Sequence, residues 1–397
     1  MKEFDGVICF GGEDWWYHNR GHFDMQIMRE LSGRVPVLYI NSVGMRVPRA
    51  AEGWMFLRRV ARKLRSIRRG FVIIREHFAV LSPLAAPGRF GRLVSKLFLP
   101  MQVRRAMRRL GIQHPVLWIA CPPGVQFLDE LNSVGVVYQR TDRYESFSHV
   151  NTDEIHSNDR TLKQRADFTI FCSRTLLEEE REQCSRSVFI DHGVDFDRFA
   201  AAGTAIEDPD DVAPLPRPRV GFVGGIDAHT FDPQLFRQIA TTLSEVTFVV
   251  VGASSLSDDW SDLPNVHHLG QRQYELVPRY MASCDVLIMP WNSSPWIRAC
   301  NPVKLKEYLA VGRPVVSTPF DELDHYNEVV SVANGAEAFI NAIRAALNEP
   351  GNPLERRNRV QDQTWANRGE AVLRSLLDAG LKPGGADPVQ PTETDDD

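Results

Sequence analysis

Short, nearly continuous apolar runs alternate with amphipathic stretches along the chain, and this alternation starts twice. In the first half the apolar runs lie at 6–10, 35–41, 71–74, 116–121, 134–138, 168–172 and 188–190. In the second half they lie at 219–223, 247–252, 266–269, 286–290, 314–318 and 329–332. Strands that are apolar throughout and separated by helices are typical of parallel sheets covered on both faces. The pattern therefore predicts an α/β protein with two doubly wound domains.

The stretch between the two series is rich in Pro, Asp and Ala and reads as a linker at 201–218. We therefore expect an N-terminal domain at 1–200 and a C-terminal domain at 219–360. A helix at 361–381 is expected to pack back on the N-terminal domain, and the Pro/Gly-rich, then acidic end at 382–397 to be disordered. Two such domains would face each other across a cleft at the carboxyl ends of their strands, where doubly wound sheets bind ligands.

Composition narrows the class of protein further. The chain has 397 residues, 43% hydrophobic and 24% charged, which suits two globular domains. Its six cysteines show no metal-ligand spacing, and four of them (Cys9, Cys121, Cys172 and Cys284) fall in or beside expected strands as reduced core residues. No signal-peptide pattern and no apolar run of about 18 residues is visible, so we expect a cytoplasmic protein.

The net charge of −5 hides a strong asymmetry. Residues 46–109 contain 17 Lys/Arg and two Glu, a balance of +15, so the rest of the chain carries −20. Read as a helix, 54–69 places Val60, Leu64 and Ile67 on one side with arginines flanking them. Such a segment suits an anionic membrane surface, but equally a domain helix with a solvated basic back. No nucleic-acid-binding motif accompanies the charge, so nucleic acid is not an expected partner.

The segment 301–318 reads as a short capped helix that leads into a buried strand. Asn301 suits the N-cap, Pro302 the first helical position, and Gly312 a left-handed C-terminal closure. Within the helix, Lys304 lies in the first turn, where the helix dipole disfavours a cation, and Glu307 follows on the same face. A phosphate shared between Lys304 and the free backbone N–H groups would explain this arrangement. A surface ion pair of Lys304 and Glu307 without a ligand is the alternative.

Each predicted domain begins with a strand that ends in two glycines, Gly11–Gly12 and Gly224–Gly225. Paired glycines after a parallel strand let a ligand approach the backbone. Neither pair belongs to a G-x-G-x-x-G fingerprint or a P-loop, which disfavours nicotinamide cofactors and P-loop chemistry.

These residues together resemble a known family. The segments 167–176, 192–199, 221–225 and 301–318 occur in the order typical of GT-B fold glycosyltransferases. Among these the chain is similar to the family-4-like (group 1) enzymes of bacterial exopolysaccharide and teichuronic-acid synthesis. The resemblance implies two Rossmann-like domains facing a cleft. It also implies transfer of a hexose-type sugar from a nucleotide-diphosphate sugar, UDP-linked, to a glycan or lipid-linked acceptor in cell-surface polysaccharide synthesis. From the basic segment 46–109 we expect the protein to be peripheral on the inner face of the plasma membrane.

The resemblance also assigns donor-binding residues. Glu307 would accept hydrogen bonds from the ribose hydroxyls, and Lys304 would neutralise the diphosphate together with the N–H groups of Gly224 and Gly225. Trp291, just after a strand, and Arg298 complete the expected donor site. The family usually has a second glutamate eight positions before the ribose-binding one, where this chain has Ala299, so the stereochemical outcome stays open.

An inverting reaction would need a general base, and we identify Asp142, just past an N-domain strand, as the first candidate. A turn or N-cap role between Arg140 and Arg143 is its structural alternative. The loop after the first strand supplies the remaining candidates: Asp14 and His18 for catalysis, and Gly12, Trp15, Trp16 and His22 for acceptor binding. The two tryptophans suit stacking on a sugar but equally suit packing.

Asp195 and Asp197 have the D-x-D spacing of a metal-binding pair, but they lie in a turn before the linker, and we expect no metal site and no cofactor beyond the donor substrate. Two other functions remain compatible with this sequence. One is a nucleotide-sugar 2-epimerase of the same fold, and the other is a non-catalytic homologue that binds a nucleotide sugar or a partner, which Ala299 favours.

Overall fold

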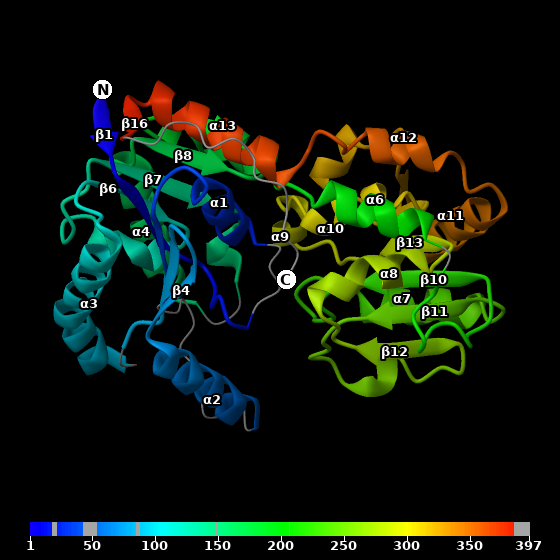
Figure 1. Cartoon of the computed structure of the whole chain (residues 1–397). Coiled ribbons are helices and arrows are strands. Elements are labelled where there is room, and N and C mark those ends of the chain that lie inside the picture. Colours follow the sequence, from blue (N-terminus) through cyan, green and yellow to red (C-terminus); the bar gives the residue numbers. More distant parts are fainter. Residues whose placement is uncertain (18–21, 43–53, 85–87, 148–149, 206, 385–397) are drawn as a thin grey trace. The chain divides into compact units, whose positions relative to one another are not determined.

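The computed structural model describes residues 1–17, 22–42, 54–84, 88–147, 150–205 and 207–384 (Figure 1). The chain divides into two compact units: unit 1 comprises Met1–Asp191 and Arg368–Asp397, and unit 2 comprises His192–Asn367. The division falls after Asp191 rather than at residue 200. Helix α6 (Phe196–Thr204) belongs to unit 2 because its Phe199, fully buried, is part of the unit 2 core. The expected linker at 201–218 therefore lies within unit 2.

Unit 1 contains an eight-stranded sheet in the order β4-β5-β3-β2-β6-β7-β8-β9. The strands are β2 (Gly6–Phe10), β3 (Val37–Ile40), β4 (Phe71–Arg75), β5 (Phe78–Leu81), β6 (Pro115–Ile119), β7 (Gly135–Arg140), β8 (Phe168–Phe171) and β9 (Ser187–Phe189). The helices are α1 (Phe23–Leu31), α2 (Trp54–Arg69), α3 (Gly88–Leu110), α4 (Thr152–Arg165) and α5 (Arg174–Glu180). Strand β2 lies between β3 and β6, so the sheet has its topological switch point where β2 and β6 end.

The apolar run at 71–74 is not the buried parallel strand that the pattern predicts. It forms β4, an edge strand antiparallel to β5, and Ile73 is 64% exposed. The chain reverses at His77, whose φ of 62° is in the left-handed region, and β5 follows as the buried strand that pairs in parallel with β3. Strand β5 escaped prediction because only four apolar residues separate His77 from Ser82.

The chain returns from unit 2 to unit 1 through α13 (Trp365–Asp378). Within unit 1, Arg34 forms an ion pair of 2.8 Å with Glu370 of this helix, and Gly369 leaves room for the side chain of Glu30. The chain then forms β16 (Leu381–Pro383), which pairs in parallel with β1 (Lys2–Phe4). Strands β1 and β16 thus form a separate two-stranded sheet in unit 1.

Unit 2 contains a six-stranded, all-parallel sheet in the order β12-β11-β10-β13-β14-β15. Its strands are β10 (Arg219–Val223), β11 (Thr247–Val251), β12 (Val266–Gly270), β13 (Val286–Met289), β14 (Val315–Ser317) and β15 (Ser331–Val332). Its helices besides α6 are α7 (Pro233–Thr242), α8 (Val277–Ala282), α9 (Pro295–Arg298), α10 (Val303–Val311), α11 (Ala336–Asn348) and α12 (Pro353–Asn358). Helices α6, α8, α10 and α12 pack together, and α7 packs with α11. The switch point lies where β10 and β13 end.

Helix α10 has nearly the predicted limits. It begins at Val303 with Pro302 as N-cap, one residue later than the sequence suggests, and it ends at Gly312, which has a left-handed φ of 86°. The Gly312 N–H donates to the Tyr308 carbonyl at 3.2 Å and so satisfies one terminal carbonyl of the helix. The Tyr308 hydroxyl accepts a 2.8 Å hydrogen bond from the Val223 N–H, which fixes α10 against the end of β10.

Candidate functional site

The glycine pair of unit 2 lies at the switch point, directly after β10. Gly224 has a φ of 154°, and a Cβ atom on it would lie 2.0 Å from Lys304 Nζ. Gly224 is therefore favoured by its own conformation, and a side chain there would displace the Lys304 ammonium group. A Cβ atom on Gly225 would meet its nearest neighbour, an oxygen of Asp227, at 3.5 Å, so this glycine is under no comparable restriction.

Lys304 projects from the first turn of α10 among aromatic rings. Its Nζ lies 4.2 Å from the ring centroid of Phe222 and 5.4 Å from that of Trp291. Burial lowers the pKa of Lys304 to about 8, against the opposing effect of nearby Glu307 and Asp227. Among the described residues, the charge of Lys304 is favoured by the carboxylates of Glu307 and Asp227 and by the two ring faces. An anion bound beside it would relieve the cost of burial.

Glu307 lies one turn further along α10 and is 7% exposed. Its Oε1 accepts a 2.9 Å hydrogen bond from the hydroxyl of Tyr274, which lies in the short helix η6 (Tyr274–Leu276) after β12. Burial raises the pKa of Glu307 to about 7, although the Tyr274 hydroxyl and Lys304 both lower it. A surface ion pair with Lys304, the alternative from the sequence, is therefore wrong. Tyr274 escaped sequence reasoning because it is an isolated aromatic residue in a three-residue helix, which is too short to show periodicity.

Trp291 follows β13 and is 6% exposed. Its backbone N–H donates to Thr318 Oγ1 at 3.1 Å, and its ring lies 5.4 Å from Phe320. Its indole Nε1 is buried and has no hydrogen-bond partner among the described residues. A buried donor beside a half-buried cation is the arrangement expected around an anionic or hydroxylated ligand.

Arg298 is placed differently from the other expected residues of this site. Its side chain is 71% exposed, and its Nε lies 4.0 Å from Asp321 Oδ1. The next residue, Ala299, is 2% exposed and closes the short helix α9. The structure thus groups Gly224, Trp291, Lys304 and Glu307, whereas the contacts of Arg298 in the described structure join it to Asp321.

In unit 1, hydrogen bonds hold the loop after β2 at Gly12, Asp14, Trp15 and Trp16. The Gly12 N–H donates to Asp24 Oδ2 at 3.0 Å, and the Trp15 N–H donates to Asn41 Oδ1 at 2.9 Å. Asp14 Oδ1 accepts from the Trp16 N–H at 3.1 Å. The loop residues 12–17 therefore have a defined conformation at the end of the sheet.

The two tryptophans of this loop are engaged in packing, although both stay half-buried. The Trp15 ring lies 5.3 Å from Tyr39 and 4.9 Å from Phe78. The Trp16 Nε1 donates to Ser82 Oγ at 2.8 Å. Both rings thus have contacts within unit 1, as the packing alternative expects.

Two histidine candidates belong to the same loop region. His18 lies outside the described residues. His22 is the N-cap residue of α1 in extended conformation and makes no side-chain capping hydrogen bond.

Asp142 lies just after β7, as predicted. Burial raises its pKa to about 6, opposed by Arg140 and assisted by the negative charge of Glu13 in the loop after β2. The structure therefore brings Asp142 close to that loop. The following short helix has Arg143, not Asp142, at its N-cap position, so the capping alternative for Asp142 is not what the structure shows.

Arg140 is held rigidly beside Asp142. Its side chain is 1% exposed, and its Nε and Nη2 donate to the two oxygens of Glu180 at 3.0 and 2.9 Å. Nη2 also donates to Glu145 Oε2 at 3.0 Å. Arg140 therefore acts as a fixed positive charge near Asp142, a role that the sequence did not indicate.

Three observations on the described residues concern other kinds of site. No group of three or more His, Cys, Asp or Glu side chains in the described ranges is arranged to hold a metal ion. Asp195 is the N-cap residue of α6 and forms a 3.1 Å ion pair with Arg198. In the part of the chain that the structure covers, every helix is too short or too polar to cross a bilayer.

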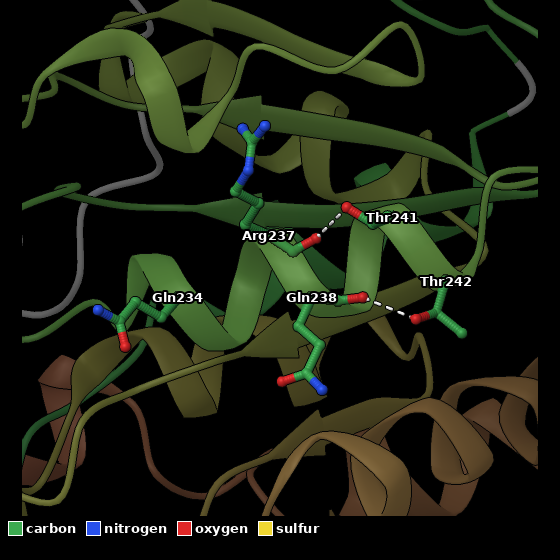
Figure 2. A pocket seen from close by; sticks show the side chains of 5 residues that line it. All are labelled: Gln234, Arg237, Gln238, Thr241 and Thr242. Carbon is green, nitrogen blue, oxygen red and sulfur yellow. Dashed lines mark hydrogen bonds between the residues drawn. The ribbon is translucent and has the colours of Figure 1, made fainter.

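Figure 2 shows a depression on α7 lined by five residues of that one helix: Gln234, Arg237, Gln238, Thr241 and Thr242. The Thr241 and Thr242 hydroxyls donate to helix carbonyls at 2.8 and 2.9 Å. Since these polar groups are satisfied within the helix and do not converge, we assign no function to this depression.

Two doubly wound sheets, parallel except for the edge strand β4, are the architecture of the GT-B class of proteins. Solved structures agree on the fold. Sucrose-phosphate synthase from Thermosynechococcus elongatus superposes with a TM-score of 0.67 at 15% identity, covering 94% of this chain and 100% of that one. Anabaena Alr3699/HepE in complex with UDP-glucose gives 0.65 at 13% identity, covering 94% and 99%. A trehalose-6-phosphate structure from E. coli with UDP-2-fluoro glucose gives 0.62 at 10% identity, covering 94% and 99%.

Sequence comparison identifies the family. Residues 217–349 match the family model described as glycosyl transferases group 1. A putative teichuronic acid biosynthesis glycosyltransferase, TuaH of Bacillus subtilis, is 30% identical over 277 residues, which are 63% of this chain and 68% of that protein. The chain belongs to the group 1 glycosyltransferases.

Proposed function

We propose that this protein transfers a sugar from a nucleotide-diphosphate sugar, UDP-linked, to a glycan or lipid-linked acceptor in cell-surface polysaccharide synthesis. The observation that carries the proposal is the position of Lys304 Nζ against Gly224, with the Trp291 ring and the buried Glu307 beside it. The presence of UDP and UDP-glucose in the Alr3699/HepE complexes supports the donor. The similarity to TuaH supports the pathway.

The proposed chemistry uses these groups in two ways. Lys304 and the N–H groups after β10 would neutralise the diphosphate as the sugar–phosphate C–O bond breaks and its electron pair leaves with the phosphate oxygen. Glu307 would hold the ribose. With an inverting outcome, the oxygen of the acceptor hydroxyl would bond to the anomeric carbon while Asp142 takes the proton of that hydroxyl. We propose that no metal ion takes part and that no cofactor is needed.

A nucleotide screen by thermal shift tests the proposal. UDP, GDP, ADP, TDP and their sugar conjugates would each be added at about 100 times the dissociation constant, which stabilises a protein by roughly 2.7 kcal/mol. We expect a selective shift with UDP compounds that Glu307→Ala and Lys304→Ala both lose. Absence of a shift with every nucleotide would contradict the proposal.

Turnover separates this function from its alternatives. Release of UDP that depends on an acceptor indicates transfer, whereas interconversion of two donor epimers indicates an epimerase. Ala299, which is buried, stands where the family usually has a second glutamate. Its presence specifically favours a binding protein, which would hold UDP tightly without any turnover.

The affinity for UDP should be highest between about pH 7 and pH 8. Glu307, with a pKa of about 7, is ionised and able to accept two ribose hydrogen bonds only above that value. Lys304, with a pKa of about 8, loses its charge above it and no longer attracts the diphosphate. Calorimetric titration at pH 6, 7.5 and 9 should show an affinity about tenfold lower at both extremes. In Glu307→Gln, the loss at pH 6 should disappear while the loss at pH 9 remains.

We further propose that the protein is cytoplasmic and peripheral on the inner face of the plasma membrane, held there by part of the basic segment 46–109. The asymmetry of charge supports this, because anionic lipid attracts each basic residue near its surface.

A further inference from the structure

Exposed large apolar side chains gather in the basic segment of unit 1. Among the described residues, six of the eleven exposed ones lie within 46–109: Leu64, Ile73, Ile74, Leu84, Phe98 and Met101. The other five are scattered over the remaining chain. Apolar and cationic side chains exposed in the same segment fit a partner that offers both anionic groups and an apolar interior.

Helix α2 exposes both apolar and cationic side chains on the side that faces away from the interior of unit 1. Ser66 is fully buried, so its side of the helix faces the protein. Leu64, 58% exposed, precedes it by two residues, which places Leu64 about 200° around the helix from Ser66. Arg68 shares the side of Leu64 because it lies four residues further on, and Arg65 and Arg68 are both exposed.

A second patch of this kind lies where α3 meets the segment after β5. The Leu84 N–H donates to Gln102 Oε1 at 2.9 Å, and Gln102 Nε2 donates back to the Leu84 carbonyl at 3.2 Å. Leu84, 70% exposed, is thereby held beside the helical turn that exposes Phe98 and Met101, at 55% and 60%. The exposed Arg105 follows Met101 by one turn.

Helix α2 is also connected to the loop at residues 12–17. Ser66 Oγ lies 3.2 Å from Ser82 Oγ, which accepts the indole hydrogen bond of Trp16. The Arg69 guanidinium lies 4.4 Å from the Trp16 ring, and that of Arg62 5.8 Å from the Tyr17 ring.

Lys63 strengthens this connection. Its Nζ donates to the Ser42 carbonyl at 2.8 Å, directly after β3, and Asp14 attracts its charge. Hydrogen bonds and cation–ring contacts therefore join α2 to the loop at residues 12–17, and a change in the position of α2 would change the surroundings of that loop.

We infer that α2, together with Leu84 and the exposed turn of α3, docks on an anionic lipid bilayer, and that docking further stabilises the loop at residues 12–17 in the hydrogen-bonded conformation that it already has. The expected acceptor-binding loop would then bind an acceptor that is anchored in the same bilayer. The docking assigns residues to the membrane association proposed above, and the last step rests on the proposed transfer of a sugar. A bilayer is the occupant that the surface favours, because its anionic headgroups match the arginines and its interior accepts Leu64, Leu84, Phe98 and Met101.

Co-sedimentation with vesicles tests the docking. The protein should bind vesicles of 30% phosphatidylglycerol in phosphatidylcholine and not vesicles of phosphatidylcholine alone. The double variant Arg65→Gln/Arg68→Gln should bind roughly 25-fold more weakly, since each basic residue contributes about fivefold. Phe98→Ser/Met101→Ser should also lose binding. The matched control Arg160→Gln/Arg374→Gln removes two exposed arginines of unit 1 elsewhere and should bind as the wild type does.

Equal binding by the control and the Arg65/Arg68 variant, with equal melting temperatures, would overturn the docking. For the loop, amide hydrogen exchange in residues 12–17 should slow on the anionic vesicles. Trp16→Phe, which removes the hydrogen bond to Ser82, should still bind vesicles but show less slowing. Unchanged exchange in the vesicle-bound wild type would overturn the coupling. UDP binding measured in the same samples reports on the proposed function separately, because the donor site lies in unit 2.

Discussion

Lys304→Met is expected to lower the affinity for UDP about 100- to 1000-fold while leaving the protein as stable as before or more stable. Removing one partner of a buried, hydrogen-bonded charge pair costs about 2–5 kcal/mol of binding free energy. Burial lowers the pKa of Lys304 to about 8, so the lysine is still charged at pH 7, but its charge costs more free energy in the folded protein than in the unfolded chain. A methionine fills a similar volume without that cost. Calorimetric titration with UDP and urea unfolding at pH 7 measure the two effects.

The control for this variant is Arg344→Gln, which removes one exposed positive charge from α11 in the same unit. It should change neither the affinity for UDP nor the stability. If Lys304→Met bound UDP within threefold of the wild type, the lysine would not contact the diphosphate. If the variant unfolded at a much lower urea concentration, its lost affinity would reflect damage to the fold.

Asp142→Asn is expected to reduce kcat by 10²- to 10⁴-fold and to leave the affinity for UDP unchanged. A general base contributes a factor of this size, whereas the donor is expected to bind in unit 2. In the wild type, kcat should rise with pH through about pH 6, because the Asp142 carboxyl has its pKa there and must be ionised to accept a proton. The variant should lose that rise. Initial rates at saturating UDP-sugar between pH 5 and pH 8 would measure it.

Asp153→Asn is a suitable control, because Asp153 is an exposed carboxylate in the first turn of α4. It should keep both kcat and the pH profile. A variant at Asp142 with unchanged kcat would assign the residue a structural role. Loss of activity without any change in the pH profile would indicate that another group, such as Asp14, removes the proton.

The donor-site segment was the part most readable from sequence. The limits of α10 follow from Pro302 and Gly312, which act through local backbone preferences. The glycine pair after β10 likewise indicates, from local sequence alone, a place where another group lies close to the backbone. Lys304 and Glu307, three residues apart on one helix, had to share a face. The sequence did not reveal the hydrogen bond from Tyr274 to Glu307, because the two residues are 33 positions apart.

The candidate residues of unit 1 were less readable, and for a related reason. Asp142 and Glu13 are 129 positions apart, and their proximity depends on β2 and β7 ending at the same edge of one sheet. The β4–β5 hairpin was misread because strand direction depends on pairing partners, and the apolar run at 71–74 has the same composition whichever way its neighbour runs.

The sequence by itself determined the α/β class, most strands, the two glycine pairs and the family, because each depends on local patterns or on short motifs. The tertiary structure alone decided which charges are buried, and therefore the pKa values of Lys304, Glu307 and Asp142. It also decided that α2 is tied to the loop at residues 12–17. Burial and long-range contacts arise from packing between elements distant in the chain, and no local pattern encodes them.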